Sequence, residues 1–259
     1  MKVKDVMMKD VVFVDKDINL RHVLKIMKKH DITKIPVVED KKLIGVITDN
    51  IIAVKLGSIR KKGIPASRLH ASSVTDKEFE VVRPDTDVKT ILKKVGGHGP
   101  TMLNVVENGK LVGVVTKADL LHLVDSDLRL HQVMQKSVQV VSPDDRVVHA
   151  RRIMIDEHVA RLPVVNNGLL VGVISDNEIV FALADIKRSF SLGKQKHRLD
   201  ELLVGNIMKS PAIWTTSNMT CKETARIMLK KHVGFLPIID NDKLTGVVTR
   251  TDLLKTIKL

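Results

Sequence analysis

The sequence predicts an α/β fold built from four copies of one βαββα unit, arranged as two pairs in a compact disc. Two observations lead to this prediction: a hairpin phrase recurs four times, and each copy is flanked by amphipathic helical patterns. A unit of about 50 residues has too little core to be stable alone. We therefore expect neighbouring copies to pair across their sheets.

The hairpin phrase is the clearest part of the repeat. It reads IPVVEDKKLIGVIT at 35–48, LNVVENGKLVGVVT at 103–116, LPVVNNGLLVGVIS at 162–175 and LPIIDNDKLTGVVT at 236–249. In every copy a Pro or Asn stands nine residues before a Gly and twelve before a Thr or Ser. The short polar connections, such as Asn-Gly, are typical of tight antiparallel hairpins.

An amphipathic helix is expected ahead of each hairpin. In the first copy Leu20, Val23, Leu24 and Met27 follow the i, i+3, i+4, i+7 spacing of a helix face. Nineteen residues before the Pro or Asn, each copy has a residue suited to a helix N-cap. These predicted caps are Asp17, Asp85, Asp144 and Asn218.

Two basic segments indicate how the copies are grouped. Residues 55–70 and 186–199 each carry five Lys or Arg and no acid, and the whole chain has a net charge of +13. They fall between copies one and two and between copies three and four. We therefore predict a first pair over 1–125 and a second over 126–259. The expected repeats lie at about 1–57, 68–125, 126–186 and 200–259.

Composition excludes several classes of protein. The longest uncharged apolar stretch, 162–175, is too short to cross a bilayer, and Asp5 and Asp10 interrupt the place of a secretory signal. We expect a cytoplasmic protein without a membrane partner. Cys221 is the only cysteine, which excludes an internal disulfide and a zinc site of several thiolates. No metal-ligand or Gly-rich phosphate motif indicates an enzyme.

The four hairpins, with the form h-P-h-h…G-h-h-[ST]-x-x-D, resemble the cystathionine-β-synthase (CBS) domain family over almost the whole chain. The arrangement is similar to the gamma subunit of AMP-activated protein kinase and to stand-alone prokaryotic CBS proteins. The resemblance implies a regulatory sensor that binds AMP, ADP or ATP and signals to a regulated protein. S-adenosylmethionine, a ligand of some relatives, is an open alternative, and a homodimer is compatible with the resemblance.

The resemblance also implies a role for the acid three positions after the Thr or Ser, which holds ribose hydroxyls in the family, with the Thr or Ser near the phosphate. Copy two has Thr116 and Asp119, copy four has Thr249 and Asp252, and copy three has Glu178. A carboxylate can accept both hydrogen bonds of a cis-diol. The same motif is also a capping box. We predict nucleotide sites at the two Asp residues and a cap at Glu178.

A second family position, two residues before the Pro, carries a cation that reaches phosphates held by a neighbouring copy. Here it is Lys34 in copy one and Arg161 in copy three. We predict that Lys34 acts with Asp119 and Arg161 with Asp252, within a pair or across the disc. The alternative is that both are ordinary surface cations.

The base is expected against the segment just before the second strand. This segment contains Thr101 and Met102 in copy two, and Gly234 and Phe235 in copy four. Small or apolar residues with accessible amides suit a purine edge and face. Thr216 aligns with a family position near the sugar or base.

The basic segments leave two other interpretations open. They could bind the phosphates of a nucleic acid, which requires only Lys and Arg. They could instead surround the polyphosphate of a bound nucleotide, which would favour ATP over AMP. With aromatic residues at only 2% of the chain, platforms for stacking single-stranded bases are not expected.

Overall fold

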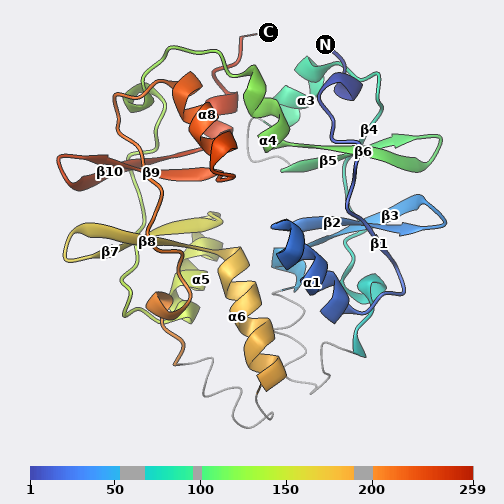
Figure 1. Ribbon diagram of the computed structural model, residues 1–259, viewed down its shortest axis with the longest axis horizontal. Helices are drawn as coiled ribbons and strands as arrows, with labels where there is room; N and C mark the ends of the chain where they lie inside the picture. Colours follow the sequence, from blue (N-terminus) through green and yellow to red (C-terminus); the bar gives the residue numbers. More distant parts are fainter. Residues whose placement is uncertain (53–67, 96–100, 190–200, 259) are drawn as a thin grey trace.

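The computed structural model describes residues 1–52, 68–95, 101–189 and 201–258, and Figure 1 shows a disc with hairpins pointing outward from central helices. The first two copies form one half of the disc and the last two form the other. The first copy faces the third, and the second faces the fourth. The predicted α/β disc of four repeats is confirmed.

Each copy contains the predicted helices and hairpin in order. The first has β1 (Val14–Asp15), α1 (Leu20–His30), β2 (Lys34–Glu39) and β3 (Lys42–Thr48), followed by a helix from Asp49. The second has β4 (Val81–Val82), α3 (Val88–Val95), β5 (Met102–Glu107), β6 (Lys110–Thr116) and α4 (Lys117–Leu120). The third has α5 (Val147–Asp156), β7 (Arg161–Asn166), β8 (Leu169–Ser175) and α6 (Asp176–Ser189). The fourth has α8 (Cys221–Lys230), β9 (Phe235–Asp240), β10 (Lys243–Thr249) and α9 (Arg250–Leu254).

Short 3-10 turns connect these elements. They are η1 (Val3–Asp5), η3 (Ala71–Val74), η4 (Leu121–Leu123), η5 (Leu130–Gln132) and η6 (Val204–Asn206). In copies three and four the first strand is reduced to a parallel bridge, from Val141 to Val164 and from Thr215 to Ile238.

The predicted helix caps of copies one, three and four were wrong by two residues. The N-cap of α1 is Asn19, whose side chain accepts a hydrogen bond from the His22 amide at 2.9 Å, and the N-cap of α8 is Thr220. Asp17 lies in the preceding turn, where its amide donates to Asp15 Oδ1. Asp and Asn favour turns and caps for the same chemical reason, so composition alone does not separate the two positions.

The two hairpins of the first pair join into one sheet with the order β1-β2-β3-β6-β5-β4, through a bridge between Lys42 and Lys110. In the second pair the hairpins β7-β8 and β9-β10 form separate sheets. The segment ahead of each copy crosses to the other hairpin of its pair. These bridges are Met8 to Val114, Asp76 to Val46, Gln135 to Val247 and Lys209 to Val173.

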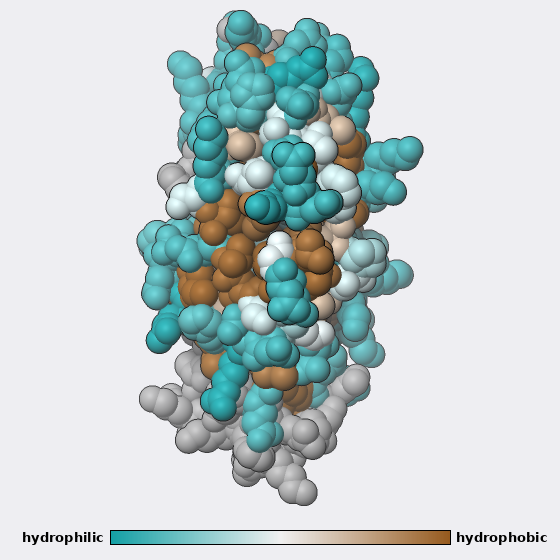
Figure 2. Space-filling model, turned by 90° about the vertical axis from the view of Figure 1, so that its left-hand side faces the viewer, coloured by the Kyte–Doolittle hydropathy of each residue, from teal (hydrophilic) through white to brown (hydrophobic). Residues whose placement is uncertain are grey.

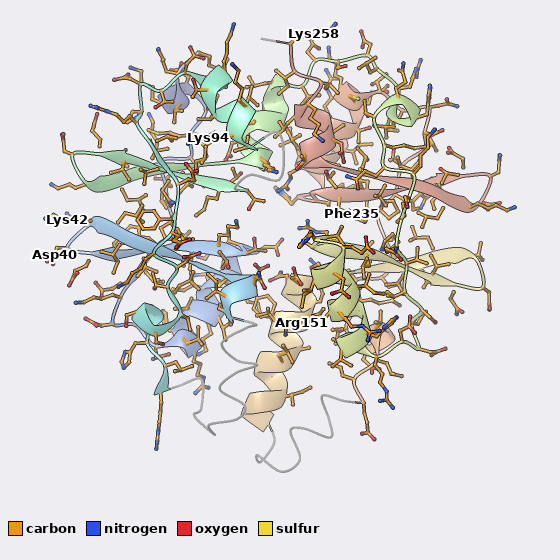
Figure 3. The ribbon with its side chains drawn as sticks, turned by 180° about the vertical axis from the view of Figure 1, so that it is seen from behind. Asp40, Lys42, Lys94, Arg151, Phe235 and Lys258 are labelled. Atoms are coloured by element: carbon orange, nitrogen blue, oxygen red, sulfur yellow. The ribbon has the colours of Figure 1, made fainter. Side chains whose placement is uncertain are left out.

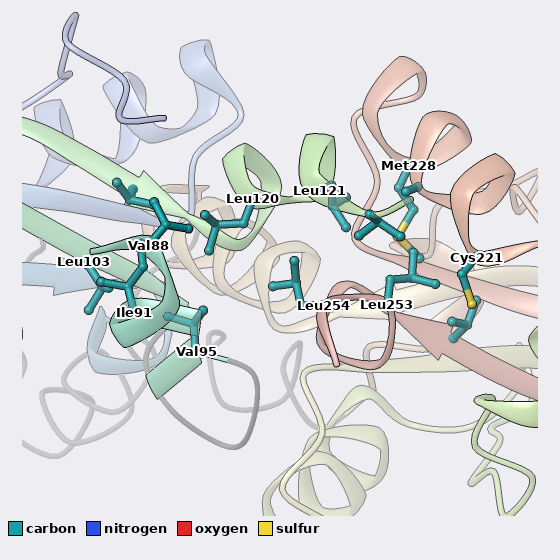
Figure 4. Close-up of a cluster of buried hydrophobic side chains, with 14 of the residues drawn as sticks. Val88, Ile91, Val95, Leu103, Leu120, Leu121, Cys221, Met228, Leu253 and Leu254 are labelled. Atoms are coloured by element: carbon teal, nitrogen blue, oxygen red, sulfur yellow. The ribbon is translucent and has the colours of Figure 1, made fainter. Parts of the chain in front are cut away.

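The largest buried cluster spans copies two and four, which lie on different halves of the disc. Leu120 and Leu121 of copy two pack in it with Leu253 and Leu254 of copy four (Figure 4). A second cluster belongs to copy one but includes Val180 of α6, and a third belongs to copy three. Helices therefore join the two halves, whereas a continuous sheet joins the two copies of the first half.

The outer edge of the second pair carries exposed apolar side chains. Figure 2 shows them gathered midway along the edge at which the β7-β8 and β9-β10 hairpins lie. Exposed large residues of this pair include Leu169 and Trp214. Within the described parts of the chain, no helix is long and apolar enough to span a membrane.

Candidate functional site

The predicted site residues of each hairpin meet at its inner end. The residue two before the Pro or Asn pairs across the hairpin with the Thr or Ser: Lys34 with Thr48, Met102 with Thr116, Arg161 with Ser175 and Phe235 with Thr249. Figure 3 shows Phe235 at the inner end of β9, whereas Asp40 and Lys42 lie at an outer hairpin tip. The fold thus directs four equivalent strand ends toward the centre of the disc.

The acids of copies two, three and four all form capping boxes. Asp119 Oδ2 accepts hydrogen bonds from the amide and hydroxyl of Thr116 at 2.7 and 2.8 Å. Asp252 Oδ2 accepts the same pair from Thr249 at 2.8 and 2.7 Å. Each carboxylate uses only one oxygen for this purpose, so capping leaves the other oxygen for a second partner.

The cap of copy three completes this comparison. Glu178 Oε2 accepts hydrogen bonds from the amide of Ser175, at 2.9 Å, and from its hydroxyl. Its second oxygen lies 3.3 Å from Nζ of Lys209. The capping role predicted for Glu178 therefore agrees with its contacts.

The position directly after the Thr or Ser supplies a second set of charges that the sequence analysis missed. It holds Asp49, Lys117, Asp176 and Arg250 in the four copies. Burial, and then the charge of Lys34, lower the pKa of Lys117, while Asp252 opposes this shift. Lys117 Nζ also donates to Thr251 Oγ1 of copy four at 2.7 Å. Lys117 thus reaches across the interface between the two halves.

Arg250 is placed in the corresponding way on the other half. Burial, and then the charge of Arg161, lower the pKa of Arg250, while Asp119 opposes this shift. Its Nε–H is buried and donates no hydrogen bond to any described residue. Two pairs of cations therefore lie near enough to interact electrostatically: Lys34 with Lys117, and Arg161 with Arg250. Repetition of a basic residue at this position in copies two and four was the signal available in the sequence.

Two carboxylates lie among these cations. Burial raises the pKa of Asp49, with the charges of Lys34 and Arg161 opposing this shift. Burial and the charge of Asp49 raise the pKa of Asp176 to about 6, against Arg151 and Arg161. Lys34 and Arg161 are thus central residues near Asp49, and no described contact joins them to Asp119 or Asp252.

The predicted base segments lie beside the same strand ends. The Thr101 carbonyl accepts a hydrogen bond from the Lys117 amide, and the Gly234 carbonyl accepts one from the Arg250 amide, both at 3.3 Å. A Cβ at position 234 would lie 3.0 Å from Arg250 Nε, so a larger residue here would require the Arg250 side chain to shift by a few tenths of an ångström. Phe235 is buried and Met102 is half-buried.

Thr216 is not brought to this group. Its neighbour Thr215 bridges to Ile238, in the middle of β9, and Thr216 follows it toward the outer edge. Three residues of strand between Ile238 and Phe235 correspond to about 10 Å. Thr216 therefore lies apart from Gly234 and Phe235 along the strand direction.

A cavity of about 400 Å³ lies at the outer end of copy two, away from the predicted residues. Its lining includes Arg83, Lys94 and the turn at Asn108. Lys94 is paired with Glu80 at 2.7 Å. In the described residues, no group of three or more His, Cys, Asp or Glu is placed to hold a metal ion.

Proteins of known sequence and structure share this organisation. MJ1225 of Methanocaldococcus jannaschii is 25% identical over 95% of each chain. Its crystal structure, described as that of a proposed archaeal homologue of g-AMPK, covers 98% of this chain and 99% of that one at 22% identity, with a TM-score of 0.86. MJ1404 of the same organism is 26% identical over 98% of this chain, which spans only 61% of that relative.

A shorter relative is CBSX2 of Arabidopsis thaliana, which has been crystallised in complex with AMP. That structure covers 49% of this chain and 93% of its own, at 24% identity and a TM-score of 0.41. The family model for the CBS domain matches residues 3–56, 71–126, 130–185 and 204–259. Because these four matches cover most of the chain, the protein belongs to the CBS-domain family.

Proposed function

We propose that this protein is a regulatory sensor that binds AMP, ADP or ATP at the centre of its disc and signals occupancy to a partner protein. The observation that carries the proposal is that Lys34 and Lys117, and likewise Arg161 and Arg250, lie near enough to interact electrostatically. Like-charged side chains repel in a partly buried site, and a phosphate relieves this repulsion. The likeness to MJ1225, described as a proposed γ-AMPK homologue, supports the same conclusion.

The sequence analysis paired Lys34 with Asp119 and Arg161 with Asp252. The electrostatic interactions in the structure favour the opposite pairing. Asp119 interacts with Arg250, which lies near Arg161, so a ribose on Asp119 would direct its phosphate to these two arginines. Asp252 interacts with Lys117, which lies near Lys34. Each proposed site therefore takes its diol acceptor from one half of the disc and cations from the other half.

This arrangement provides a route from binding to signalling. A nucleotide that contacts both halves stabilises the arrangement in which they are closest, and so shifts the population of relative orientations. A surface that changes with this orientation would be read by the regulated protein. We propose the division at residue 126 as the boundary between the two moving pairs.

The paired cations also favour phosphate-bearing ligands over S-adenosylmethionine. S-adenosylmethionine carries a sulfonium and no phosphate, so it would add positive charge beside paired cations and is disfavoured. The basic segments 55–70 and 186–199, on which nucleic-acid binding and the preference for ATP depend, lie mostly outside the described residues. A nucleotide at the described centre is the function that the geometry supports best.

The test is calorimetric titration with AMP, ADP, ATP, GTP and S-adenosylmethionine. We expect Asp119→Asn with Asp252→Asn to weaken AMP binding at least tenfold, because a neutral amide replaces each charged acceptor of the diol. Asparagine keeps an oxygen for the cap, so the fold should persist. Glu178→Gln is the matched control, since it alters a third capping box and should leave AMP affinity unchanged. Equal affinity in the double variant and the wild type would refute the assignment.

A further inference from the structure

Each copy places one residue against the other hairpin of its pair, next to the strand that leads to the Thr or Ser. This residue stands 28 positions before the Pro or Asn in every copy and is Met8, Asp76, Gln135 or Lys209. Its amide donates to a backbone carbonyl of the other hairpin of the pair, on the residue directly after the hairpin glycine, at 2.8 to 2.9 Å. The repeat register therefore places four different side chains at one equivalent location.

The side chains at this location make different contacts with the capping acids. Gln135 Nε2 donates to both oxygens of Asp252, at 3.2 and 3.1 Å. Lys209 pairs with the free oxygen of Glu178. Met8 occupies the location that serves Asp119, and a thioether has no hydrogen to donate. In the described part of the chain, Asp119 Oδ1 accepts no hydrogen bond.

Equivalent packing confirms that the locations correspond. In three of the copies the residue just ahead is a methionine whose Sδ lies close to the hairpin glycine, whereas Thr75 takes this place ahead of Asp76. A Cβ at Gly113 would be 2.7 Å from Met7 Sδ, and one at Gly246 would be 3.0 Å from Met134 Sδ. The difference between Met8 and Gln135 is therefore a change of side chain on matching backbones.

We propose that Gln135 is an internal competitor for the ribose at Asp252, so that the Asp119 site fills first and the Asp252 site fills only after Gln135 has moved away. One amide group bonded to both carboxylate oxygens makes the contacts that a cis-diol would make. Gln135 is exposed and can leave without opening the core. This inference rests on the proposed nucleotide function and assigns unequal affinities to its two sites.

The test exchanges Met8 and Gln135 between the two sites. Each exchange is made in a protein whose other site has been weakened by an Asp→Asn substitution. In the Asp119→Asn protein, Gln135→Met should strengthen AMP binding about tenfold, because two hydrogen bonds to a charged acceptor need no longer be broken. In the Asp252→Asn protein, Met8→Gln should weaken AMP binding about tenfold. Calorimetric titration of the full chain gives both affinities, and thermal unfolding verifies that each variant is folded.

Gln139→Met is the matched control, since Gln139 is exposed in the same segment and its amide lies 3.5 Å from Glu157 instead. Its AMP affinity should equal that of its background. If the isolated sites bind AMP but Gln135→Met lowers the affinity at Asp252 or leaves it unchanged, the competitor role is overturned and the proposed function stands. If no variant and no wild-type protein binds any adenine nucleotide, both are overturned.

Discussion

Burial, and then the charge of Asp49, destabilise the ionised form of Asp176. It is half-buried and faces Asp49, Glu178, Arg151 and Arg161, and its pKa is raised to about 6. An acid whose pKa is higher in the folded chain than in the unfolded chain binds its proton more tightly when folded. Its contribution to stability is therefore complete below about pH 4 and declines as pH rises through about 6.

We expect Asp176→Asn to raise the free energy of unfolding by about 2–3 kcal/mol at pH 8 and by about half of that at pH 5, because the amide carries no charge to desolvate. Urea unfolding at the two pH values measures the difference. Asp156→Asn makes the same charge change on the exposed end of α5 and should shift stability by less than about 0.5 kcal/mol. A pH-independent gain at position 176 would contradict this account.

Helix α6 is the element that links copies one and three. It starts at Asp176 in the central site, and its Val180 and Phe181 pack with the core of copy one. Lys28 of α1 lies with Nζ 5.8 Å from the centroid of the Phe181 ring, a cation–π contact. Ile179, also on α6, belongs to the core of copy three. One helix thus completes a core in each half of the disc.

Removing methyl groups from α6 should therefore affect different copies according to the residue changed. Val180→Ala is expected to cost about 2 kcal/mol, because Val180 is buried and its loss leaves a cavity. Hydrogen exchange should accelerate in β2 and β3 more than in β7 and β8. Ile179→Ala is the neighbouring control and should show the reverse pattern. Faster exchange confined to copy three in both variants would disprove the linking role.

At the scale of the whole molecule, the two interfaces between halves differ in kind. Copies two and four share one apolar core, whereas copies one and three meet through α6 and the charged centre. The apolar contacts lie between α4, η4, α8 and α9. Helices α4 and α9 also carry Asp119 and Asp252, so the proposed nucleotide sites adjoin this core.

Leu254→Ala tests the shared core, since Leu254 is buried where α9 meets α4 (Figure 4). We expect a loss of about 2–4 kcal/mol in the free energy of unfolding. Amide protection in β5 and β6 should fall together with that in β9 and β10, because both copies contribute to the cluster. Loss of protection in copy four alone would show that the two cores are independent.

The sequence predicted local features well. The register of Pro36, Gly45 and Thr48 recurs in all four copies, and each hairpin pairs as that register requires. The capping boxes at Asp119, Glu178 and Asp252 also follow from spacing alone. These features depend on residues close together in the chain, where turn chemistry and periodicity decide the outcome.

The partners of the site residues could not be predicted in the same way. Gln135 and Lys209 reach acids of the other copy in their pair, and Lys117 reaches Thr251 of the other half. Repeat spacing aligns such positions but does not say which copies touch. The misplaced caps at Asp17 and its equivalents show the same limit within a copy, since turns and caps share their preferred residues.

The sequence by itself determined that four βαββα units occur, where each hairpin turns, and which residues stand at its inner end. Only the tertiary structure decided that copy one faces copy three and that copy two shares a core with copy four. It also decided that Lys34 and Arg161 lie near Asp49 and that Arg151 and Arg161 lie near Asp176. The physical reason is that hydrogen-bonded turns and amphipathic faces are set by neighbours in the chain. Docking of whole faces depends on how apolar surfaces far apart in sequence fit together.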